Sequence, residues 1–341
     1  MKSIVLLTYA LFDRWPRYAN LFLESCRSNS TVDFLVLTTC LPPARELPAN
    51  VKVLNLDLRQ IQALASERLG IHVNLKWPFK MVDIKPALGV IFEDVFSGYD
   101  FWGYCDVDDI FGDIRDFLSD EVLESYDVIC ARREFVTGHF ILFRNTEELA
   151  RLYSRSRDWQ KICAGEKIFN FDECGWGLHH RLLRGENFAD VAHEARVESF
   201  MHVLARAPEV RVHLKTICAE HTWIERKDIH LRWQRGKLLD LSADREVMYY
   251  HIHDLKREPS FYVPDWKAMP EAFLITRRGA FWIGDETLRQ SLTTAVKRGF
   301  STCGRWTAAL YPSCRRRLLR FWRQRRGVRG SSSRPTASPS A

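Results

Sequence analysis

The most informative stretch of the sequence is Phe101-Trp-Gly-Tyr-Cys-Asp-Val-Asp-Asp-Ile-Phe-Gly-Asp-Ile114. It begins as an aromatic, apolar strand and ends in the carboxylates Asp106, Asp108 and Asp109. Acids at i and i+2 can point together into the crevice beyond the carboxyl edge of a parallel sheet. Neighbouring carboxylates repel unless a cation joins them, and Mn²⁺ or Mg²⁺ suits carboxylate and phosphate oxygens. The stretch predicts a divalent-metal site; the alternative is a solvated acidic turn that caps the next helix.

Around this stretch, apolar runs typical of buried strands alternate with helical patterns. Strands are expected at 3–8, 33–38 and 51–56, and helices at 18–26 and 58–69. This alternation predicts an α/β fold with a mostly parallel sheet flanked by helices. The other expected helices are 81–95, 117–126, 146–162 and 172–183, and the other expected strands are 99–105, 127–131, 138–143 and 247–253.

Charge divides the chain into two parts. The 341 residues include 50 Lys and Arg against 43 Asp and Glu, and 46% are apolar, which is enough for a packed core. Twelve bases and no acids follow residue 296, which leaves 38 bases against 43 acids before it. We expect one domain at 1–296, with a donor half at about 1–145 and an acceptor half at about 146–296, and a basic amphipathic and disordered tail at 297–341.

Cysteine usage and the N-terminus predict a cytoplasmic protein. The nine cysteines form no C-x-x-C pair, which argues against a disulfide framework and favours a reducing compartment. The first twelve residues favour a core strand over a signal peptide because no small-residue cleavage site follows them.

The basic tail predicts docking at the inner face of a membrane. Basic amphipathic segments with aromatic residues bind anionic lipid, and the tail contains Phe321 and Trp322 among its arginines. We expect the full chain to co-sediment with vesicles only when they contain anionic lipid. Equal sedimentation with and without residues 297–341 would contradict this expectation.

The quoted stretch resembles the strand, D-x-D and Gly-Asp-Ile run of the GT-A glycosyltransferases, and the bacterial members that build surface polysaccharide in particular. The resemblance spans about residues 3–256. It implies a Rossmann-like donor half, a UDP-sugar donor, and a metal bound by Asp108, with Asp106 at the ribose or the metal. Asp109 would be an acid that lies near the metal without binding it directly.

The resemblance also implies a histidine ligand from a late strand. His251 and His253 are two candidates on one predicted strand face, and Lys256 behind them would meet the diphosphate as a point charge. The glycine and the Lys-Pro-Trp ending of the related late motif are absent here. Lys85, in the helix before the D-x-D strand, would also contact the donor.

Further residues receive roles in donor binding and catalysis. Thr8 and Tyr9 end the first strand, where the nucleoside base would lie, and Gly138 and His139 would shape the sugar pocket. The acidic pair Asp172 and Glu173 would be catalytic and serve the acceptor. One of these acids would act as general base in an inverting enzyme, or would stabilise oxocarbenium character in a retaining one. The alternative is a pair of acids in the first turn of a helix.

The sequence therefore predicts a metal-dependent transferase that moves a hexosyl group from a UDP-sugar to a bacterial glycan or lipid-linked acceptor. A nucleotide-sugar hydrolase or nucleotidyltransferase is the first alternative, because carboxylates and a divalent ion also serve phosphoryl chemistry. A non-enzymatic protein that binds through its basic tail is the second. Nucleic acid is not an expected partner, because the tail has no recognition motif and adjoins an acidic body.

Overall fold

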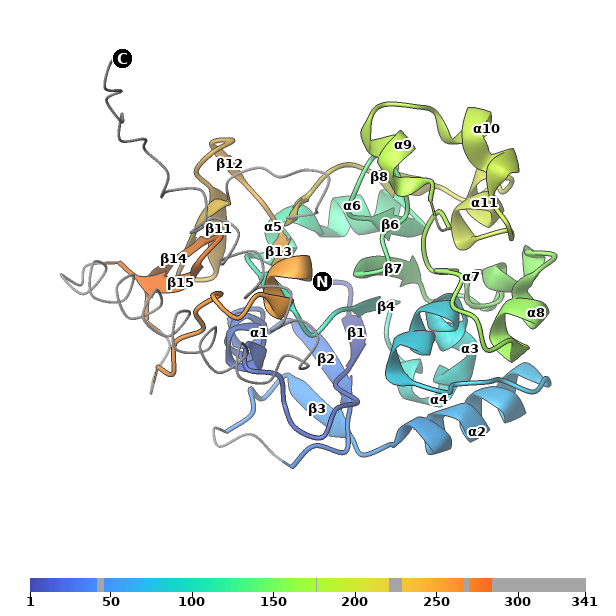
Figure 1. Cartoon of the computed structure of the whole chain (residues 1–341), viewed down its shortest axis with the longest axis horizontal. Coiled ribbons are helices and arrows are strands. Elements are labelled where there is room, and N and C mark those ends of the chain that lie inside the picture. The colour runs from blue at the N-terminus through green and yellow to red at the C-terminus, as the bar shows by residue number, and fades with distance from the viewer. Residues whose placement is uncertain (42–45, 176, 221–228, 267–269, 284–341) are drawn as a thin grey trace, which may run out of the picture. The chain divides into compact units, whose positions relative to one another are not determined.

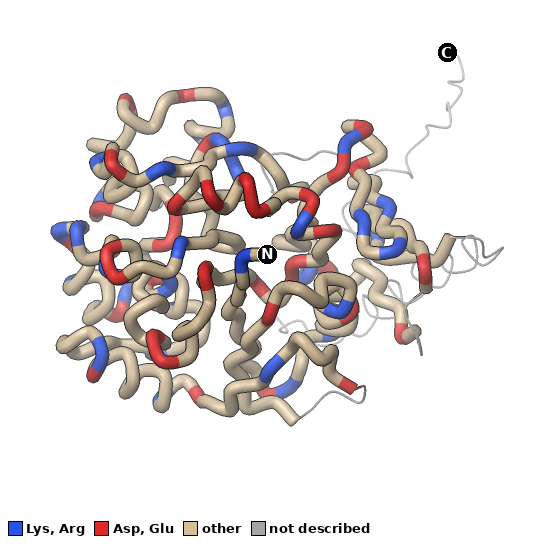
Figure 2. The backbone as a smooth tube through the Cα atoms, turned by 180° about the vertical axis from the view of Figure 1, so that it is seen from behind, with Lys and Arg blue, Asp and Glu red and all other residues tan. Residues whose placement is uncertain are grey.

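The computed structural model describes residues 1–41, 46–175, 177–220, 229–266 and 270–283. All of them belong to one compact unit, Met1–Leu288. The second unit, Arg289–Ala341, contains the predicted basic tail and lies outside the described residues. Within the described part no helix is long and apolar enough to cross a bilayer. Basic and acidic residues are interspersed along this part of the chain (Figure 2).

A seven-stranded sheet in the order β3-β2-β1-β4-β7-β6-β8 lies at the centre of the unit (Figure 1). Its strands are β1 (Ile4–Tyr9), β2 (Val32–Leu37), β3 (Val51–Leu54), β4 (Phe101–Cys105), β6 (Val128–Cys130), β7 (Phe140–Arg144) and β8 (Val212–Leu214). β1 is parallel to β2 and β4, β2 to β3, and β6 to β8, whereas β7 is antiparallel to β4 and β6. The predicted α/β class with a mostly parallel sheet is confirmed.

Short helices accompany the sheet. The α-helices are α1 (Ala19–Arg27), α2 (Leu58–Leu69), α3 (Leu88–Ile91), α4 (Glu93–Phe96), α5 (Ile114–Phe117), α6 (Asp120–Ser125), α7 (Glu147–Ala150), α8 (Trp159–Ala164), α9 (His179–Leu183), α10 (Phe188–Val191) and α11 (Phe200–Ala205). The 3₁₀ helices are η1 (Pro78–Asp83), η2 (Lys85–Ala87), η3 (Leu152–Arg155), η4 (Ala192–Glu194) and η5 (His253–Arg257). α2 begins at a capping box formed by Asp57 and Gln60 and ends at Gly70, whose φ of 66° is left-handed.

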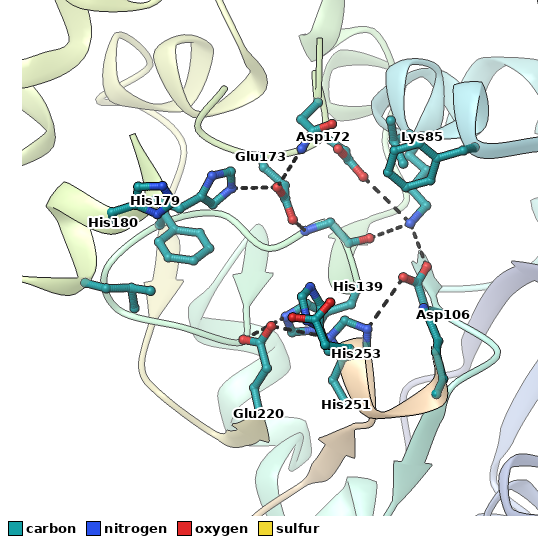
Figure 3. A pocket seen from close by; sticks show the side chains of 18 of the residues that line it. Lys85, Asp106, His139, Asp172, Glu173, His179, His180, Glu220, His251 and His253 are labelled. Atoms are coloured by element: carbon teal, nitrogen blue, oxygen red, sulfur yellow. Dashed lines mark hydrogen bonds and ion pairs between the residues drawn. The ribbon is translucent and has the colours of Figure 1, made fainter. Parts of the chain in front are cut away.

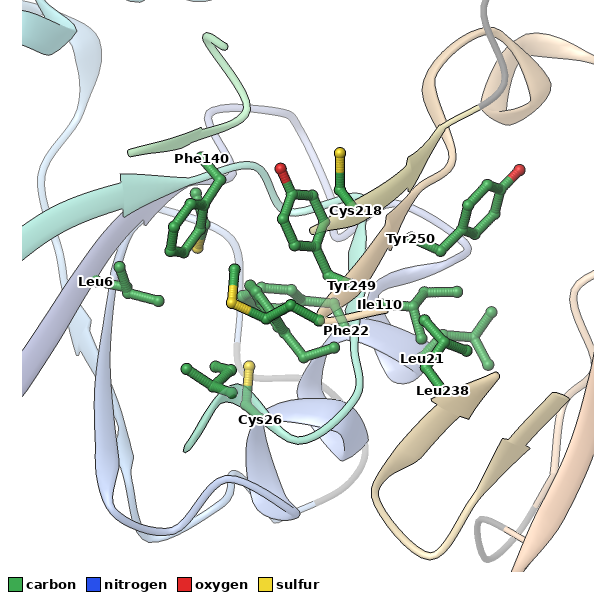
Figure 4. Packing of buried hydrophobic residues seen from close by; sticks show 14 of the residues in the cluster. Leu6, Leu21, Phe22, Cys26, Ile110, Phe140, Cys218, Leu238, Tyr249 and Tyr250 are labelled. Carbon is green, nitrogen blue, oxygen red and sulfur yellow. The ribbon is translucent and has the colours of Figure 1, made fainter. Parts of the chain in front are cut away.

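The central strands are apolar on both faces because helices cover both faces of the sheet. Ile4 and Leu6 of β1 pack in one core cluster with residues of α1, part of which Figure 4 shows. Val5 and Leu7 belong to the opposite cluster, which contains residues of α2, α3 and α4. Both faces of β1 are therefore buried, and the carboxyl ends of the strands remain for a site.

The single helix predicted at 81–95 is wrong. The chain there forms η1, η2, α3 and α4 in succession. Pro86 has no N–H and restricts Lys85 before it. In addition, Lys80 and Asp83 turn inward and bind backbone groups of residues 162–171. These inward contacts explain why the segment is broken.

Other predicted helices are shorter than expected. The segment 146–162 divides into α7, η3 and α8, and 117–126 reduces to α6. Among the described residues of 172–183 only His179–Leu183 is helical, because Gly175 and Gly177 adopt left-handed φ angles of 91° and 89°. The alternative of acids in a first helical turn therefore does not apply to Asp172 and Glu173.

Two smaller sheets that the sequence pattern did not predict complete the unit. One has the order β5-β13-β9, with strands β5 (Asp109–Phe111), β13 (Tyr249–His251) and β9 (Cys218–Glu220). The other, in the order β12-β11-β10-β14-β15, consists of β10 (His230–Gln234), β11 (Lys237–Asp240), β12 (Arg245–Glu246), β14 (Ala272–Thr276) and β15 (Gly279–Trp282). The first of these sheets carries site residues next to the D-x-D turn.

Candidate active site

The D-x-D carboxylates lie where the strand order of the central sheet reverses. β1 has β2 on one side and β4 on the other, and open α/β sheets bind ligands beyond the carboxyl ends of strands at such a point. Asp106 directly follows β4. Its N–H donates to Asp109 Oδ2 at 3.0 Å, and the Asp109 N–H donates to the Asp106 carbonyl at 3.1 Å. These bonds fix the turn that carries the acids.

Three possible metal ligands converge at this turn. Asp106, Asp108 and His251 each offer one atom, and these atoms lie within 4.8 Å of one another. His251 Nε2 is 3.2 Å from Asp108 Oδ2 and 3.9 Å from Asp106 Oδ2. Asp108 and His251 are buried, whereas the Asp106 side chain is 25% exposed. The group is thus fixed at its base and accessible at Asp106.

The expectation that His251 and His253 share one strand face is wrong. β13 ends at His251, and His253 begins η5 with a left-handed φ of 47°. His253 Nδ1 lies 3.2 Å from Asp254 Oδ2, and neither ligand group found among the described residues includes His253. Of the two predicted ligands, the structure groups only His251 with the carboxylates.

Two lysines neutralise the carboxylates. Lys85, which is buried, donates from Nζ to Asp106 Oδ1 at 2.7 Å and to the Gly138 carbonyl at 2.6 Å. Lys256 Nζ donates to Asp108 Oδ2 at 2.8 Å. Burial alone would raise the pKa of Asp108, but Lys256 and His251 hold this pKa well below its usual range. Likewise, burial lowers the pKa of Lys85 but Asp106, Tyr9 and Asp172 raise it further, so the net shift is upward.

The chemistry of this group fits a divalent cation. Two carboxylates and an imidazole are ligands that Mn²⁺ accepts, and the carboxylates alone suit Mg²⁺. Both ring nitrogens of His251 are buried without a hydrogen-bond partner among the described residues. A second group, Asp109, His139 and His251, is also within 4.8 Å but entirely buried. The Asp106 group differs in having one partly exposed member, Asp106, through which a substrate could join it.

The acidic pair Asp172 and Glu173 lies on the far side of Lys85 from the D-x-D turn (Figure 3). Asp172 Oδ2 is 3.7 Å from Lys85 Nζ, and Asp172 Oδ1 is buried without a hydrogen-bond partner in the described structure. Glu173 Oε1 accepts the Gly138 N–H at 3.1 Å, and Glu173 Oε2 is 2.6 Å from His179 Nε2. Asp172 therefore has an oxygen to offer a ligand, whereas both oxygens of Glu173 are engaged.

Gly138 is tightly enclosed by this pair. A Cβ atom at this position would collide with Asp172 Oδ2 and lie 2.9 Å from Glu173 Oε1. Gly138 is approached closely by carboxylates of the protein. Its role toward a sugar stays a prediction.

The Glu173–His179 ion pair predicts a pH-dependent stability. Burial would raise the pKa of Glu173 and lower that of His179, but the pair holds them at about 2 and about 11, with Cys174 also raising that of His179. A raised histidine pKa stabilises the fold fully below pH about 6.5, and this contribution is lost as the pH rises toward about 11. We expect His179→Gln to lower the free energy of unfolding by about 3 kcal/mol at pH about 6.

The deficit of His179→Gln should shrink at pH about 9.5. Thermal unfolding of variant and wild type at both pH values measures this change. His193→Gln is the matched control, because His193 is an exposed histidine of η4. This variant should unfold at the same temperature as the wild type at both pH values. An equal deficit at the two pH values would contradict the assignment of the ion pair.

A cavity of about 390 Å³ joins these groups. The D-x-D side contributes Asp106, His251, His253, Asp254, Lys256 and Arg257, and the acidic pair lies opposite with Lys85, Gly138 and His139. The remaining wall is formed by Phe79, Val82, Phe135, Asn170, Gly177, His179, His180, Leu183 and Glu220. The structure therefore brings most of the predicted site residues into one cavity.

Thr8 and Tyr9 lie outside the cavity lining, and His139 lines the cavity but is almost fully buried. Thr8 is buried, and neither Thr8 nor Tyr9 lines the cavity, although Lys85 Nζ is 5.6 Å from the centre of the Tyr9 ring. His139 is 4% exposed, and its Nδ1 is 2.6 Å from the Tyr249 hydroxyl. Roles of these three residues in binding a donor stay predictions.

Sequence reasoning missed two site residues, Glu220 and His179. Glu220 lies beside His139 and His251, and His179 pairs with Glu173. The signals were weak, because Glu220 ends a strand of three residues and His179 follows two left-handed glycines. The sequence signal that could have indicated Glu220 was its position directly after the short apolar run 217–219.

Comparison with known proteins gives distant structural similarities and one family. No curated protein sequence matches the chain. Xyloside xylosyltransferase 1 of mouse aligns with a TM-score of 0.40 and 10% identity, over 74% of this chain and 98% of its own. The galactosyltransferase LgtC aligns with a TM-score of 0.31 and 12% identity, over 62% and 86%. The glycosyltransferase GlyE of Streptococcus pneumoniae aligns with a TM-score of 0.30 and 14% identity, over 63% and 45%.

A family model matches far more of the sequence than half. It covers residues 6–280, which include the D-x-D turn, the acidic pair and the strand that ends at His251. The protein therefore belongs to DUF6625, a family of unknown function.

Proposed function

We propose that the protein is a metal-dependent glycosyltransferase that moves a hexosyl group from a UDP-sugar to a glycan or lipid-linked acceptor, at the inner face of a bacterial membrane. The observation that carries the proposal is the group of possible metal ligands Asp106, Asp108 and His251, flanked by Lys85 and Lys256. All of these residues except Asp108 line one cavity. Carboxylates alone could bind a free cation. The added lysines suit a site that must also accept a diphosphate.

The charges at the D-x-D side support a nucleotide diphosphate as ligand. Lys256 lines the cavity beside Asp108, and Arg257 follows it in η5. Lysine meets phosphate as a point charge, and arginine can bind it through two N–H groups. A bound Mn²⁺ or Mg²⁺ would supply Lewis-acid stabilisation of the diphosphate leaving group.

The acidic pair supports a binding position for the acceptor on the opposite side of Lys85. Transfer breaks the bond from the sugar C1 to the β-phosphate oxygen, which keeps the electron pair, and forms a bond from C1 to the acceptor oxygen. The acceptor hydroxyl loses its proton. Asp172 is the better acceptor of that proton, because its Oδ1 has no hydrogen-bond partner in the described structure, whereas Glu173 is held by His179 and Gly138.

The electrostatics of Asp172 also suit a proton acceptor. Burial and then Glu173 raise the pKa of Asp172 well above its usual range, although Lys85 lowers it. A general base works best when its pKa lies near the working pH. We assign no stereochemical outcome, because a retaining enzyme would use the same carboxylate to stabilise the oxocarbenium ion.

A screen of UDP-sugars with Mn²⁺ tests the proposal. We expect at least one donor to be consumed with release of UDP, slowly by water and faster when an acceptor glycan is added, and activity to stop with a chelator. Sugar phosphate or pyrophosphate as product would instead support a nucleotidyltransferase or a pyrophosphate-cleaving hydrolase. Consumption of no nucleotide sugar across the screen would contradict the proposal.

A further inference from the structure

We infer that Glu220 holds His251 in the tautomer and orientation that a divalent cation needs, which makes Glu220 a positioning residue. The inference rests on the proposed metal-dependent function. Sequence patterns gave Glu220 no role. Its contact with His251 comes from the pairing of β9 with β13.

Strand register places three ionisable side chains in one row. In the sheet β5-β13-β9, Asp109 is the Cα partner of His251, and His251 is the Cα partner of Glu220. Directly opposite residues on paired strands project from the same face of a sheet. The His251 ring therefore lies between two carboxylates, and the backbone fixes this arrangement.

Each ring nitrogen of His251 faces a different acid. Nε2 faces the D-x-D turn, at 3.2 Å from Asp108 Oδ2, and Nδ1 is 3.5 Å from Glu220 Oε1. Both nitrogens are buried, and neither has a hydrogen bond in the described structure. A neutral imidazole carries one N–H and one lone pair. A proton on Nδ1, directed at Glu220, leaves the Nε2 lone pair for a cation at Asp106 and Asp108.

Glu220 is itself held in place. Its side chain is 6% exposed, and Oε2 accepts a hydrogen bond from Arg132 Nη1 at 3.0 Å. Oε2 also lies 3.6 Å from His139 Nε2. Because one oxygen is bound to Arg132, the other stays directed at His251. Carboxylates of this kind fix the ring orientation of metal-binding histidines and raise their basicity.

Titration of the purified full chain with Mn²⁺, followed by the EPR signal of free Mn²⁺, tests the inference. We expect Glu220→Gln to raise the Kd for Mn²⁺ about 10- to 100-fold. In a His251→Ala background the same change should raise Kd by less than about threefold, since partners that act through one another are not additive. Glu220→Asp, which keeps the carboxylate, should give an intermediate Kd if Glu220→Gln fails to fold.

The matched control is Glu134→Gln. Glu134 also binds Arg132, through Oε2 at 3.2 Å from Nε, but it lies outside both metal-ligand groups of the described residues. The Glu134→Gln variant should therefore bind Mn²⁺ with the wild-type Kd. A wild-type Kd in Glu220→Gln would overturn the inference and leave the proposed function intact, as would an equal loss in both backgrounds. Absence of Mn²⁺ binding by the wild type would overturn both.

Discussion

Replacement of Asp108 by alanine is expected to reduce Mn²⁺-dependent turnover of the UDP-sugar about 1000-fold. Asp108 is 3% exposed and contacts both His251 and Lys256, so its removal takes away the carboxylate at the base of the proposed metal group. A metal ion supplies several kcal/mol of transition-state stabilisation, and about 4 kcal/mol corresponds to a factor of about 1000 in rate. Steady-state rates at saturating Mn²⁺ measure the loss.

Folding of the variant has to be shown separately. Lys256 is 27% exposed on its side chain and can turn to solvent once Asp108 is gone, so Asp108→Ala should keep a cooperative thermal transition. The near-isosteric Asp108→Asn should lose activity in the same way. Asp116→Ala is the matched control, because Asp116 is exposed and pairs with Lys237. A wild-type rate in Asp108→Ala would show that the site is assigned wrongly.

The largest effect on stability is expected at Asp83. Lys80 and Asp83 form an ion pair with 0% exposure on both side chains and an Nζ to Oδ2 distance of 2.7 Å. Asp83 also accepts the N–H groups of Phe169 and Phe171, and Lys80 donates to the carbonyls of Ile162 and Lys167. Asp83→Ala leaves a buried ammonium without its partner, which costs about 3–5 kcal/mol. We expect a fall in Tm of about 10 °C.

Two further variants separate the buried charge from its hydrogen bonds. The double variant Lys80→Met with Asp83→Leu removes both charges and should recover part of the loss, although the Phe169 and Phe171 N–H groups still lack their acceptor. Lys76→Met removes an exposed ion pair with Glu166 in the same region and should cost less than about 1 kcal/mol. An Asp83→Ala variant as stable as Lys76→Met would refute the role given to the pair.

Local patterns were sufficient for the D-x-D turn and for the strands of the central sheet except β8, where no strand was predicted. The runs Ile4–Leu7, Phe34–Leu37 and Phe101–Cys105 are continuously apolar because both faces of those strands are covered. The carboxylates directly after Phe101–Cys105 could be placed at the strand end from chain order alone. In these cases the environment of a residue is set by its neighbours in sequence.

Long-range contacts decided what the sequence could not reveal. Lysines are mostly exposed in folded proteins, but Lys80 is fully buried against residues 162–167. Glu220 reaches His251 only through pairing of β9 with β13. His253 leaves the strand because the backbone turns at that residue. The first two outcomes depend on tertiary partners that no local periodicity encodes.

Gly138 limits how the cavity can be altered. Its carbonyl accepts from Lys85 and its N–H donates to Glu173, so the backbone of one residue links the D-x-D side of the site to the acidic pair. Since even a methyl group would strike Asp172 there, substitutions at this position would separate the two halves before they changed the fit of a sugar. Libraries for new specificity should vary the wall formed by Phe79, Phe135 and Leu183 instead.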